Sequence, residues 1–320
     1  MAHQLKVGIV MDPIANVTYR KDSSLSLLWA AKRRGWALYY LEQEDLYLHQ
    51  GRAFGQVRDL DVFEDPDHWF DLGEPRAMPL AELDVILMRK DPPVDRAFLD
   101  ATHLLGFAER EGVLVVNPTQ VLRECNEKLF AQQFTDCIVP TVVSSNSAIL
   151  KAFHREHRDV IFKPLDGMGG SGIFRITEDG RNLGSVIEQL TSLGRYHIMA
   201  QRFIPEITEG DTRILVIDGE AVPFGLARLP AEGEVRGNLA AGGHGVVRAL
   251  NDRDRELVAR VAPVLKDKGI IIAGLDVIGG FITEINVTSP TCFREIDAQE
   301  GTDIAGRVMN AIARRVASRA

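Results

Sequence analysis

The sequence predicts a mixed α/β (α+β) fold, with a parallel sheet in the first third of the chain and antiparallel strands after it. Short apolar, β-branched runs alternate with helix-like segments from residue 5 to residue 116, which is typical of parallel strands joined by crossover helices. Further along, the Asp218-Gly219 turn between two apolar runs indicates a hairpin. The length of 320 residues suits two or three packed domains.

The first third begins with an apolar run and continues with a helix that Ser23 or Ser24 could cap and that stops at Gly35. The polar, acidic stretch 51–80 is weakly periodic, and we expect a loop or an irregular excursion there. The other elements expected in this part are strands at 5–10, 37–41, 85–88 and 114–116 and a helix at 97–110.

After Asn117-Pro118 the pattern changes to short helices and strands around two glycine-rich segments. We expect helices at 119–124, 128–135, 145–157, 183–193 and 253–268, and strands at 141–143, 160–162, 173–176, 198–201, 213–217, 222–229, 270–276 and 281–287. The glycine-rich stretch 230–247 is expected to be a long mobile loop.

Composition excludes several classes of protein. The net charge is −8 and no Lys/Arg block stands out, which argues against nucleic-acid binding. No apolar run approaches the ~18 residues needed for a bilayer span, so no integral membrane protein is expected. Cys125, Cys137 and Cys292 form no CxxC pair, and we expect free thiols in a reducing cytoplasm.

The segment Gly167–Gly172 matches GxGxxG, but a strand-like run follows it where a dinucleotide site needs a helix. No Lys-Ser/Thr follows the glycines, so it is not a P-loop either. A glycine loop between antiparallel strands can place backbone N–H groups over phosphates, or it can be a plain flexible hairpin. Lys163, at the end of the preceding strand, favours the phosphate interpretation because it supplies a fixed positive charge.

A carboxylate group is expected near the C-terminal end. Glu284 and Asn286 stand two apart on one strand and so share a face, and the Gly279-Gly280 turn would bring Asp276 beside them. Two carboxylates and an amide are hard oxygen ligands, suited to Mg²⁺ on nucleotide phosphates. Acidic residues on the wet face of a hairpin are the alternative, but the flanking residues are apolar, which favours a metal site.

The glycine-rich loop carries Arg228 and Arg236, which could close over a reacting anion; a disordered surface loop is the alternative. The sequence contains no GxSxG, HExxH or spaced histidine ligands, and no base can be assigned to activate Cys292 as a nucleophile.

Taken in order, these motifs are similar to the bacterial glutathione synthetase family, which has the ATP-grasp fold. The resemblance covers essentially the whole chain. The segments that carry it are Gly8–Ile14 with Lys21–Ser24, Met88–Pro93, Cys125–Phe130, Lys163–Gly170, Arg236–Gly243 and Thr283–Cys292.

The resemblance implies three domains: an N-terminal parallel-sheet domain on the substrate side over 1–123, a central ATP-grasp lid with the glycine flap over 124–203, and a C-terminal mixed-sheet domain with the metal site and mobile loop over 204–320. It also implies a cytoplasmic enzyme, a homotetramer, that joins γ-glutamylcysteine to glycine through an acyl phosphate, using ATP with Mg²⁺ or Mn²⁺.

The family's functional residues carry over as follows. Lys128 and Lys163 with the flap glycines Gly167, Gly169 and Gly170 would bind ATP phosphates. Backbone groups around Gln201, Phe203 and Ile204 would meet adenine, and Asp211 the ribose. Asp276, Glu284 and Asn286 would hold the metal. Arg213, Arg228 and Arg236 would stabilise anionic charge during catalysis, and the residues expected at the substrate are Arg89, Asn286 and Ser289.

Two alternatives stay open at this point. Another ATP-grasp ligase, acting on a different acid and amine, would share the metal site and flap and differ only around Arg89–Pro93 and Ser289–Glu295. A non-catalytic nucleotide-binding regulator would be expected to lack Glu284, Asn286 or the loop arginines, and all are present. Ser171-Gly172 and Thr212 depart from the family's pattern, and we expect them to tune nucleotide affinity.

Overall fold

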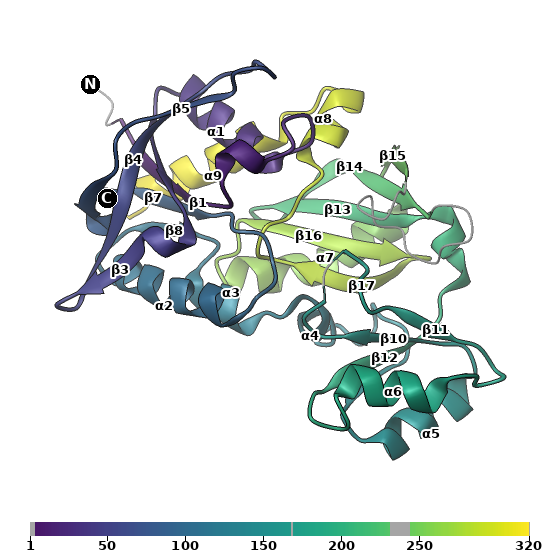
Figure 1. Ribbon diagram of the computed structural model, residues 1–320. Helices are drawn as coiled ribbons and strands as arrows, with labels where there is room; N and C mark the ends of the chain where they lie inside the picture. Colours follow the sequence, from purple (N-terminus) through teal and green to yellow (C-terminus); the bar gives the residue numbers. More distant parts are fainter. Residues whose placement is uncertain (1–3, 168, 231–243, 320) are drawn as a thin grey trace.

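The computed structural model describes residues 4–167, 169–230 and 244–319, which form three β-sheets that follow one another along the chain (Figure 1). The first sheet uses strands between residues 6 and 116, the second between 141 and 202, and the third between 211 and 286. Helices pack against all three, so the predicted mixed α/β fold is confirmed. Each sheet lies within one of the three predicted domain ranges, although the domain division itself stays a prediction.

The N-terminal sheet has the expected parallel centre. Strands β2, β1, β7 and β8 are neighbours in that order, and each pair is parallel. Their residues are apolar on both faces, as in sheets covered by crossover helices. The elements are β1 (Lys6–Val10), η1 (Ile14–Asn16), α1 (Ser23–Arg33), β2 (Ala37–Leu41), η2 (Gln43–Asp45), β3 (Leu46–His49), β4 (Arg52–Val62), β5 (Phe70–Leu72), β6 (Arg76–Pro79), η3 (Leu80–Glu82), β7 (Val85–Met88), α2 (Arg96–Arg110) and β8 (Leu114–Val116).

Two expectations for this region are corrected. The α1 N-cap is Asp22, whose Oδ1 accepts from Leu25 N (2.7 Å), because a carboxylate at this position reaches the free N–H groups of the first turn. The stretch 51–80 is not a loop: β4 is antiparallel to β2 and pairs with β3, β5 and β6. Small residues at the inward positions Ala53 and Gly55 conceal the alternation of this strand.

The central sheet, defined here as β9–β12, is antiparallel throughout with the order β11-β10-β12-β9. Helices α5 and α6 lie side by side against it (Figure 1) and enclose a separate small core that includes Leu150, Phe162 and Ile187. The elements are α3 (Thr119–Glu124), α4 (Glu127–Ala131, shorter than the expected 128–135), β9 (Thr141–Ser144), α5 (Ser147–His157), β10 (Val160–Pro164), β11 (Phe174–Ile176), α6 (Leu183–Thr191) and β12 (Ile198–Arg202).

The C-terminal sheet is also antiparallel, with the order β15-β14-β13-β16-β17, and the predicted hairpin at Asp218-Gly219 joins β13 to β14. Residues 244–247, expected in a mobile loop, belong instead to β15, which pairs with β14; 231–243, including Arg236, lie outside the described residues. The elements are η4 (Pro205–Glu209), β13 (Asp211–Ile217), β14 (Glu220–Leu229), β15 (His244–Ala249), α7 (Asp252–Asp267), β16 (Ile272–Ile278), β17 (Phe281–Asn286), α8 (Phe293–Glu300) and α9 (Ile304–Ala317).

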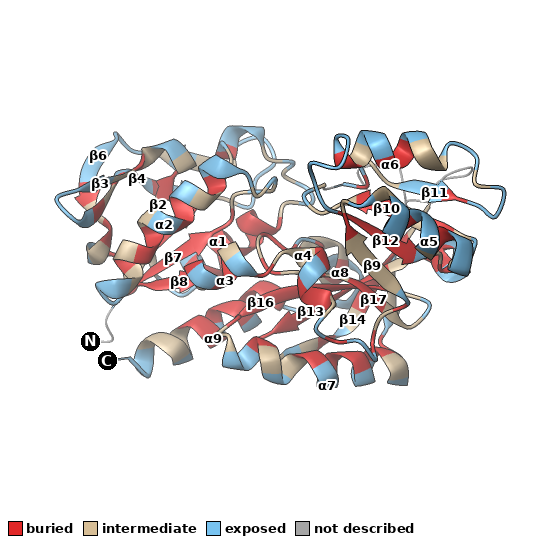
Figure 2. Ribbon diagram, turned by 90° about the horizontal axis from the view of Figure 1, so that it is seen from below, coloured by how far each residue is buried: buried red, intermediate tan, exposed pale blue. Residues whose placement is uncertain are grey.

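The N- and C-terminal sheets share one hydrophobic core. Helix α9, which was not among the helices expected from the sequence, packs against α1 (Figure 1) and brings Ile304, Val308 and Ile312 to the N-terminal strands. Figure 2 shows buried residues along the inward faces of α7 and α9 and through the central strands of both sheets. The C-terminal end of the chain therefore fixes the two sheets relative to each other.

A buried asparagine ties the two sheets at the base of the β16–β17 hairpin. Asn117, directly after β8, donates through Nδ2 to Ile272 O (2.7 Å) and Val287 O (2.6 Å). Its Oδ1 accepts from Ile271 N (2.9 Å) and Ile272 N (3.1 Å). The amide thus has its main donor and acceptor positions filled, which makes this junction rigid.

The predicted state of the cysteines is confirmed: all three are buried and free. Within the described ranges, no helix is both long enough and apolar enough to cross a bilayer.

Candidate active site

A cavity of about 560 Å³ lies where the central and C-terminal sheets meet the loops that follow β1 and β7. Every predicted site residue that the structure describes lines it. These residues are Arg89, Lys128, Lys163, Gly167, Gly169, Gly170, Gln201, Phe203, Ile204, Asp211, Arg213, Arg228, Asp276, Glu284, Asn286 and Ser289. Sequence reasoning thus located the cavity, while the roles of these residues stay predictions.

The β16–β17 hairpin brings the expected oxygen ligands together. Asp276 lies opposite Glu284 in the register, and Asn286 lies opposite Gly274. The amide Nδ2 of Asn286 donates to Asp276 Oδ2 (3.3 Å) and to Gly274 O (3.4 Å). These bonds orient the amide, and its Oδ1 accepts no hydrogen bond from the described residues.

Two arginines hold the Asp276 carboxylate. The sequence analysis placed both arginines in the site but did not predict that they pair with Asp276. Arg213, its partner across the β13–β16 pair, donates to both carboxylate oxygens. Arg228 Nη2 lies 2.9 Å from Asp276 Oδ2 and 2.7 Å from Asp211 Oδ2. Burial alone would raise the pKa of Asp276, but Arg213 and Arg228 hold it well below its usual range. Asp276 is therefore ionised and fully paired.

Asp211 differs from Asp276 although the two share Arg228. Its Oδ1 is buried and has no hydrogen-bond partner among the described residues. Burial, offset in part by Arg228 and reinforced by the charge of Asp276, raises the pKa of Asp211 to about 6. One oxygen of this carboxyl group is thus available to a ligand.

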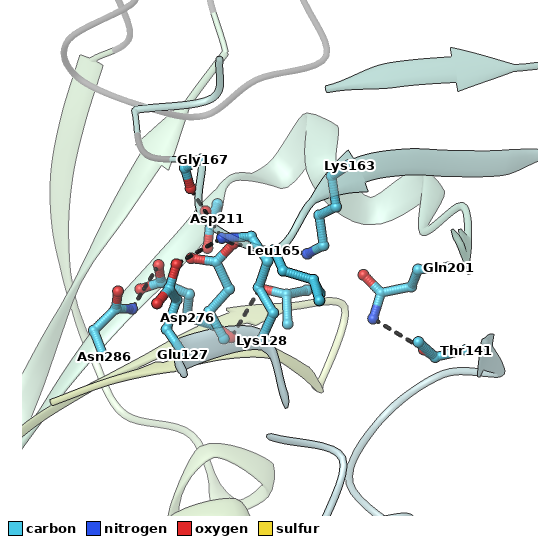
Figure 3. Close-up of polar contacts among 12 residues, drawn as sticks. Glu127, Lys128, Thr141, Lys163, Leu165, Gly167, Gln201, Asp211, Asp276 and Asn286 are labelled. Carbon is cyan, nitrogen blue, oxygen red and sulfur yellow. Dashed lines mark hydrogen bonds and ion pairs between the residues drawn. The ribbon is translucent and has the colours of Figure 1, made fainter. Parts of the chain in front are cut away.

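Two buried lysines lie near Glu284, and Figure 3 shows that they come from different elements. Lys128, in α4, donates to Glu127 Oε1 (2.7 Å) and Gly167 O (2.9 Å), and its Nζ lies 3.5 Å from Glu284 Oε1. Lys163, at the end of β10, has only the 3.7 Å contact with Glu284 Oε1 among the described residues. Burial lowers the pKa of Lys163; for Lys128 the opposing effects of Glu284 and Glu127 exceed burial and raise its pKa. Of these two lysines, Lys163 has the fewer partners among the described residues.

The glycine segment is a loop between antiparallel strands, as predicted, since Phe162 in β10 pairs with Phe174 in β11. Gly169, Gly170 and Gly172 have φ values of 63°, 80° and 72°, which L residues with a side chain rarely adopt. The loop is anchored by Lys128 on Gly167 O (Figure 3) and by Asn126 Nδ2 on Leu165 O (2.9 Å). Three positions of the loop thus favour glycine; Met168 lies outside the described residues.

The wall formed by β12 carries the expected nucleotide-base residues. Gln201 is buried and donates through Nε2 to Thr141 Oγ1 (3.3 Å) (Figure 3). The ring of Phe203 lies under the Arg175 guanidinium at 3.6 Å, which fixes the ring at the cavity edge. Ile204 adds a buried apolar surface.

At the other end of the cavity, Arg89 is 4% exposed. Its Nε donates to Ser24 Oγ (3.1 Å) and its Nη2 to Pro290 O (3.0 Å), while Nη1 is buried without a partner among the described residues. Ser289 Oγ donates to Arg89 O (3.0 Å), so this predicted substrate residue also holds the loop after β7 in place. Burial lowers the pKa of Arg89.

Sequence reasoning assigned no role to five further acidic residues that line the cavity, which are Asp12, Asp22, Asp91, Glu127 and Glu295. Glu127 pairs with Lys128, and Glu295, in the first turn of α8, has a buried Oε2 without a partner within the described part of the chain. Glu127 lies inside Cys125–Phe130, which carries the family resemblance, and Glu295 ends Ser289–Glu295, where another ligase would differ, but only the fold brings them to the cavity.

The departure at Thr212 does not face the site. Thr212 alternates with Arg213 along β13, and its Oγ1 accepts from Arg248 Nη2 (3.1 Å), which also contacts the buried Asp254. Thr212 is absent from the cavity lining, so we no longer expect it to tune nucleotide affinity.

The donor set around Asp276 fits a divalent cation in its chemistry. Glu284, Asn286 Oδ1 and one oxygen of Asp276 are hard oxygen donors on adjacent strands. Within the described ranges no group of three or more His, Cys, Asp or Glu side chains forms a metal site, so the amide oxygen of Asn286 is needed to complete the set.

Comparison with known proteins identifies relatives for the whole chain. Residues 5–123 match the family "Prokaryotic glutathione synthetase, N-terminal domain" and residues 127–301 match "Prokaryotic glutathione synthetase, ATP-grasp domain". The glutathione synthetases of Pseudomonas putida and Pseudomonas aeruginosa are 57% and 58% identical to the chain over 315 residues, covering 98% of it and 99% of each relative.

Solved structures share the fold at low identity. D-cycloserine synthetase DcsG superposes with a TM-score of 0.68 at 16% identity, covering 97% of this chain and 99% of that one. The RiPP-associated ATP-grasp ligase of Chryseobacterium gregarium gives 0.67 at 16% identity, covering 98% and 97%. The ATP-grasp fold predicted from the sequence is thereby confirmed.

Proposed function

The chain belongs to the prokaryotic glutathione synthetase family, and on this premise we propose that it is an ATP-dependent ligase that joins γ-glutamylcysteine to glycine and forms glutathione. The observation that carries the proposal at the level of residues is the single cavity in which two buried lysines, two buried arginines and a carboxylate–amide group meet. Phosphoryl transfer requires mainly positioning and charge neutralisation, and these are the groups that provide them.

In the proposed reaction the cysteinyl carboxylate of γ-glutamylcysteine attacks the γ-phosphoryl group of ATP, which gives an acyl phosphate and ADP. The amine of glycine then attacks the acyl carbon, and phosphate leaves from the tetrahedral intermediate as the amide bond forms. No covalent bond to the protein is needed. This agrees with Cys292, a cavity thiol whose pKa is raised by burial rather than lowered as in an activated nucleophile.

Lys163 and Lys128 bind the nucleotide phosphates in this proposal. Lys163 has a single long contact, at 3.7 Å, with the residues that the structure describes, so a phosphate oxygen can become its main partner. Lys128 already bonds Gly167 O, and it therefore links the phosphates to the flap. Backbone groups of Gly167, Gly169 and Gly170 cover the phosphates from above.

At the base and sugar, Gln201, Phe203 and Ile204 line the adenine position. Asp211 accepts a hydrogen bond from a ribose hydroxyl through its buried Oδ1, which has no partner among the described residues, while Arg228 holds its other oxygen.

Asp276, Glu284 and Asn286 would hold a divalent cation, which we propose is Mg²⁺, with Mn²⁺ as the alternative. When bound, the cation would neutralise phosphate charge and orient the nucleotide. The chain's own part is to fix the ligands: the Asn286 amide is oriented by Asp276 and Gly274, and Arg213 keeps the Asp276 carboxylate in place.

Arg213, Arg228 and Arg236 are proposed to stabilise the negative charge that develops on the transferred phosphoryl group and the tetrahedral oxyanion. Arg213 and Arg228 are positioned for this by Asp276. Arg89, with Ser289 beside it, binds a carboxylate of the dipeptide through Nη1, which has no partner in the described part of the chain. We also propose a cytoplasmic homotetramer, on the strength of the family resemblance; sedimentation velocity tests the tetramer.

The proposed function is tested by ADP release from Mg-ATP in the presence of γ-glutamylcysteine, with and without glycine. We expect ADP to appear at full rate only with both substrates, with glutathione forming in step. No product from this pair would contradict the substrate assignment, and a panel of other acids and amines would then identify a different ligase or, if all fail, a nucleotide-binding regulator.

A further inference from the structure

The N-terminal end of the cavity contains two buried atoms of opposite character that lack partners. Arg89 Nη1 is a cationic donor and Glu295 Oε2 is an anionic acceptor, and neither forms a hydrogen bond with any described residue. A buried polar atom without a partner is costly, so such atoms commonly mark the place of a ligand. Both residues line the cavity, so a ligand bound there can reach both.

The same two segments hold both residues in place. Arg89 bonds Ser24 Oγ and Pro290 O, and the neighbouring Ser23 Oγ accepts from Phe293 N (3.3 Å), two residues before Glu295. The start of α1 and the start of α8 are thus fixed to each other around the loop that follows β7.

The charges that act on Glu295 come from different elements. Burial raises its pKa, and the cations Lys21, Arg294 and Arg213 oppose that effect. None of them forms an ion pair with it, and the Arg294 guanidinium instead lies over the rings of Tyr19 and Trp29, at 5.0 and 4.8 Å. The carboxylate is therefore available to a cation that arrives with the substrate.

The two substrates each carry an ammonium group, and the two groups differ in whether they must lose a proton during the reaction. The amine of glycine is the nucleophile and must lose its proton, whereas the α-ammonium of the γ-glutamyl residue keeps its charge throughout. A fixed carboxylate at hydrogen-bond distance favours the charged form of an amine. Such a carboxylate suits the γ-glutamyl end and would hinder glycine.

We propose that Glu295 and Arg89 together recognise the α-amino-acid end of the γ-glutamyl residue. Glu295 Oε2 accepts from its α-ammonium, and Arg89 Nη1 donates to its α-carboxylate. The inference rests on the proposed function and extends it, because it names the pair that distinguishes a γ-glutamyl peptide from other acyl-cysteines.

The test uses the complete enzyme with two dipeptide substrates. One is γ-glutamylcysteine, and the other is glutarylcysteine, which has the same chain without the α-amino group. In the wild type we expect kcat/KM to be about ten- to a hundredfold lower for glutarylcysteine, the range of one charge-assisted hydrogen bond. Glu295→Gln should lose a similar factor with γ-glutamylcysteine, change less than about threefold with glutarylcysteine, and leave the KM of glycine unchanged.

Glu300→Gln is the matched control, because Glu300 lies on the same helix with an exposed side chain, and it should match the wild type with both peptides. A second experiment tests Arg89→Lys with 4-aminobutyrylcysteine, an analogue that lacks the α-carboxylate. This variant should lose more activity toward γ-glutamylcysteine than toward the analogue.

Several outcomes would overturn the inference. Glu295→Gln could impair both peptides equally, raise the KM of glycine instead, or lower kcat with a changed pH profile, as a general base would. If Glu295→Gln does not fold, the wild type alone provides the test. Equal kcat/KM for γ-glutamylcysteine and glutarylcysteine would then overturn the inference. Failure of the wild type to form glutathione from γ-glutamylcysteine is a different result, since it defeats the proposed function itself.

Discussion

The two ends of the cavity differ in how far the protein satisfies its own buried charges. At the C-terminal sheet, Asp276 is bonded on both oxygens by Arg213 and Arg228. At the N-terminal sheet, Arg89 and Glu295 each keep one buried atom without a partner among the described residues. The comparison suggests that one end is organised before any ligand binds, as transition-state stabilisation requires, while the other end depends on the substrate to complete it.

The substitution expected to have the largest effect is Asp276→Asn, which removes the negative charge that orders the arginines at the C-terminal end of the cavity. Arg213 would then lose its paired carboxylate, Arg228 would keep only Asp211, and one oxygen ligand would be weakened. We expect turnover to fall by about 10²–10³, and the free energy of unfolding to fall by about 3–5 kcal/mol.

Steady-state kinetics with urea unfolding checks this prediction. Asp100→Asn, whose side chain is 66% exposed, is the matched control and should change neither quantity. Wild-type turnover in Asp276→Asn would show that the arginine–carboxylate cluster is not needed for catalysis.

A smaller change at the same end is Asn286→Ala. It removes one oxygen donor and the amide that bonds Asp276, but no charge, so the fold should persist. We expect turnover at fixed magnesium to fall by about 10- to 100-fold, with partial recovery at higher magnesium. A magnesium titration of ADP release measures this, and unchanged turnover across the titration would refute the ligand assignment.

A third effect, on the pH dependence of stability, concerns Asp211 at the same end, whose buried Oδ1 has no partner among the described residues. Its pKa of about 6 lies above the ordinary 3.8, so the folded state binds more protons between these values than the unfolded state. The contribution of Asp211 to stability is therefore present below pH 3.8 and is lost as the pH rises to about 6. The loss amounts to about 3 kcal/mol.

Asp211→Asn should remove this dependence. Unfolding by urea at several pH values from 4 to 7 should give a flatter profile for the variant than for the wild type. Parallel profiles would show that Asp211 is not protonated in the folded protein, and that its unpartnered oxygen carries a full charge.

The sequence predicted those parts of the fold in which large apolar residues follow a clear period. The parallel strands at 37–41 and 85–88 were placed with their observed limits because their residues are apolar on both faces. The strand β4 was missed, since Ala53 and Gly55 fill its inward positions. Helix α9 has Ile304, Val308 and Ile312 at a helical spacing and could have been found from that signal.

For the candidate site, sequence spacing predicted which residues lie together within one hairpin. It did not predict which residues of different elements come together. Glu284 and Asn286 were placed on one face from their separation alone, and the turn located Asp276. The pairing of Asp276 with Arg213 depends on the register between β13 and β16, which no local pattern reveals. The loss of solvent around Glu295 depends on the packing of α8 against the remote β14 and β15.

The separate core of the central sheet has a consequence for local unfolding. Leu150, Phe162 and Ile187 pack within this unit, while the two larger sheets are joined through α9 and Asn117. Amide hydrogens of β10–β12 should therefore exchange with solvent through an opening that leaves the rest folded. A nucleotide held between Lys163 of this unit and Asp276 of the C-terminal sheet would link the two parts of the molecule. Slower amide exchange in the central sheet alone would therefore show that a nucleotide is bound.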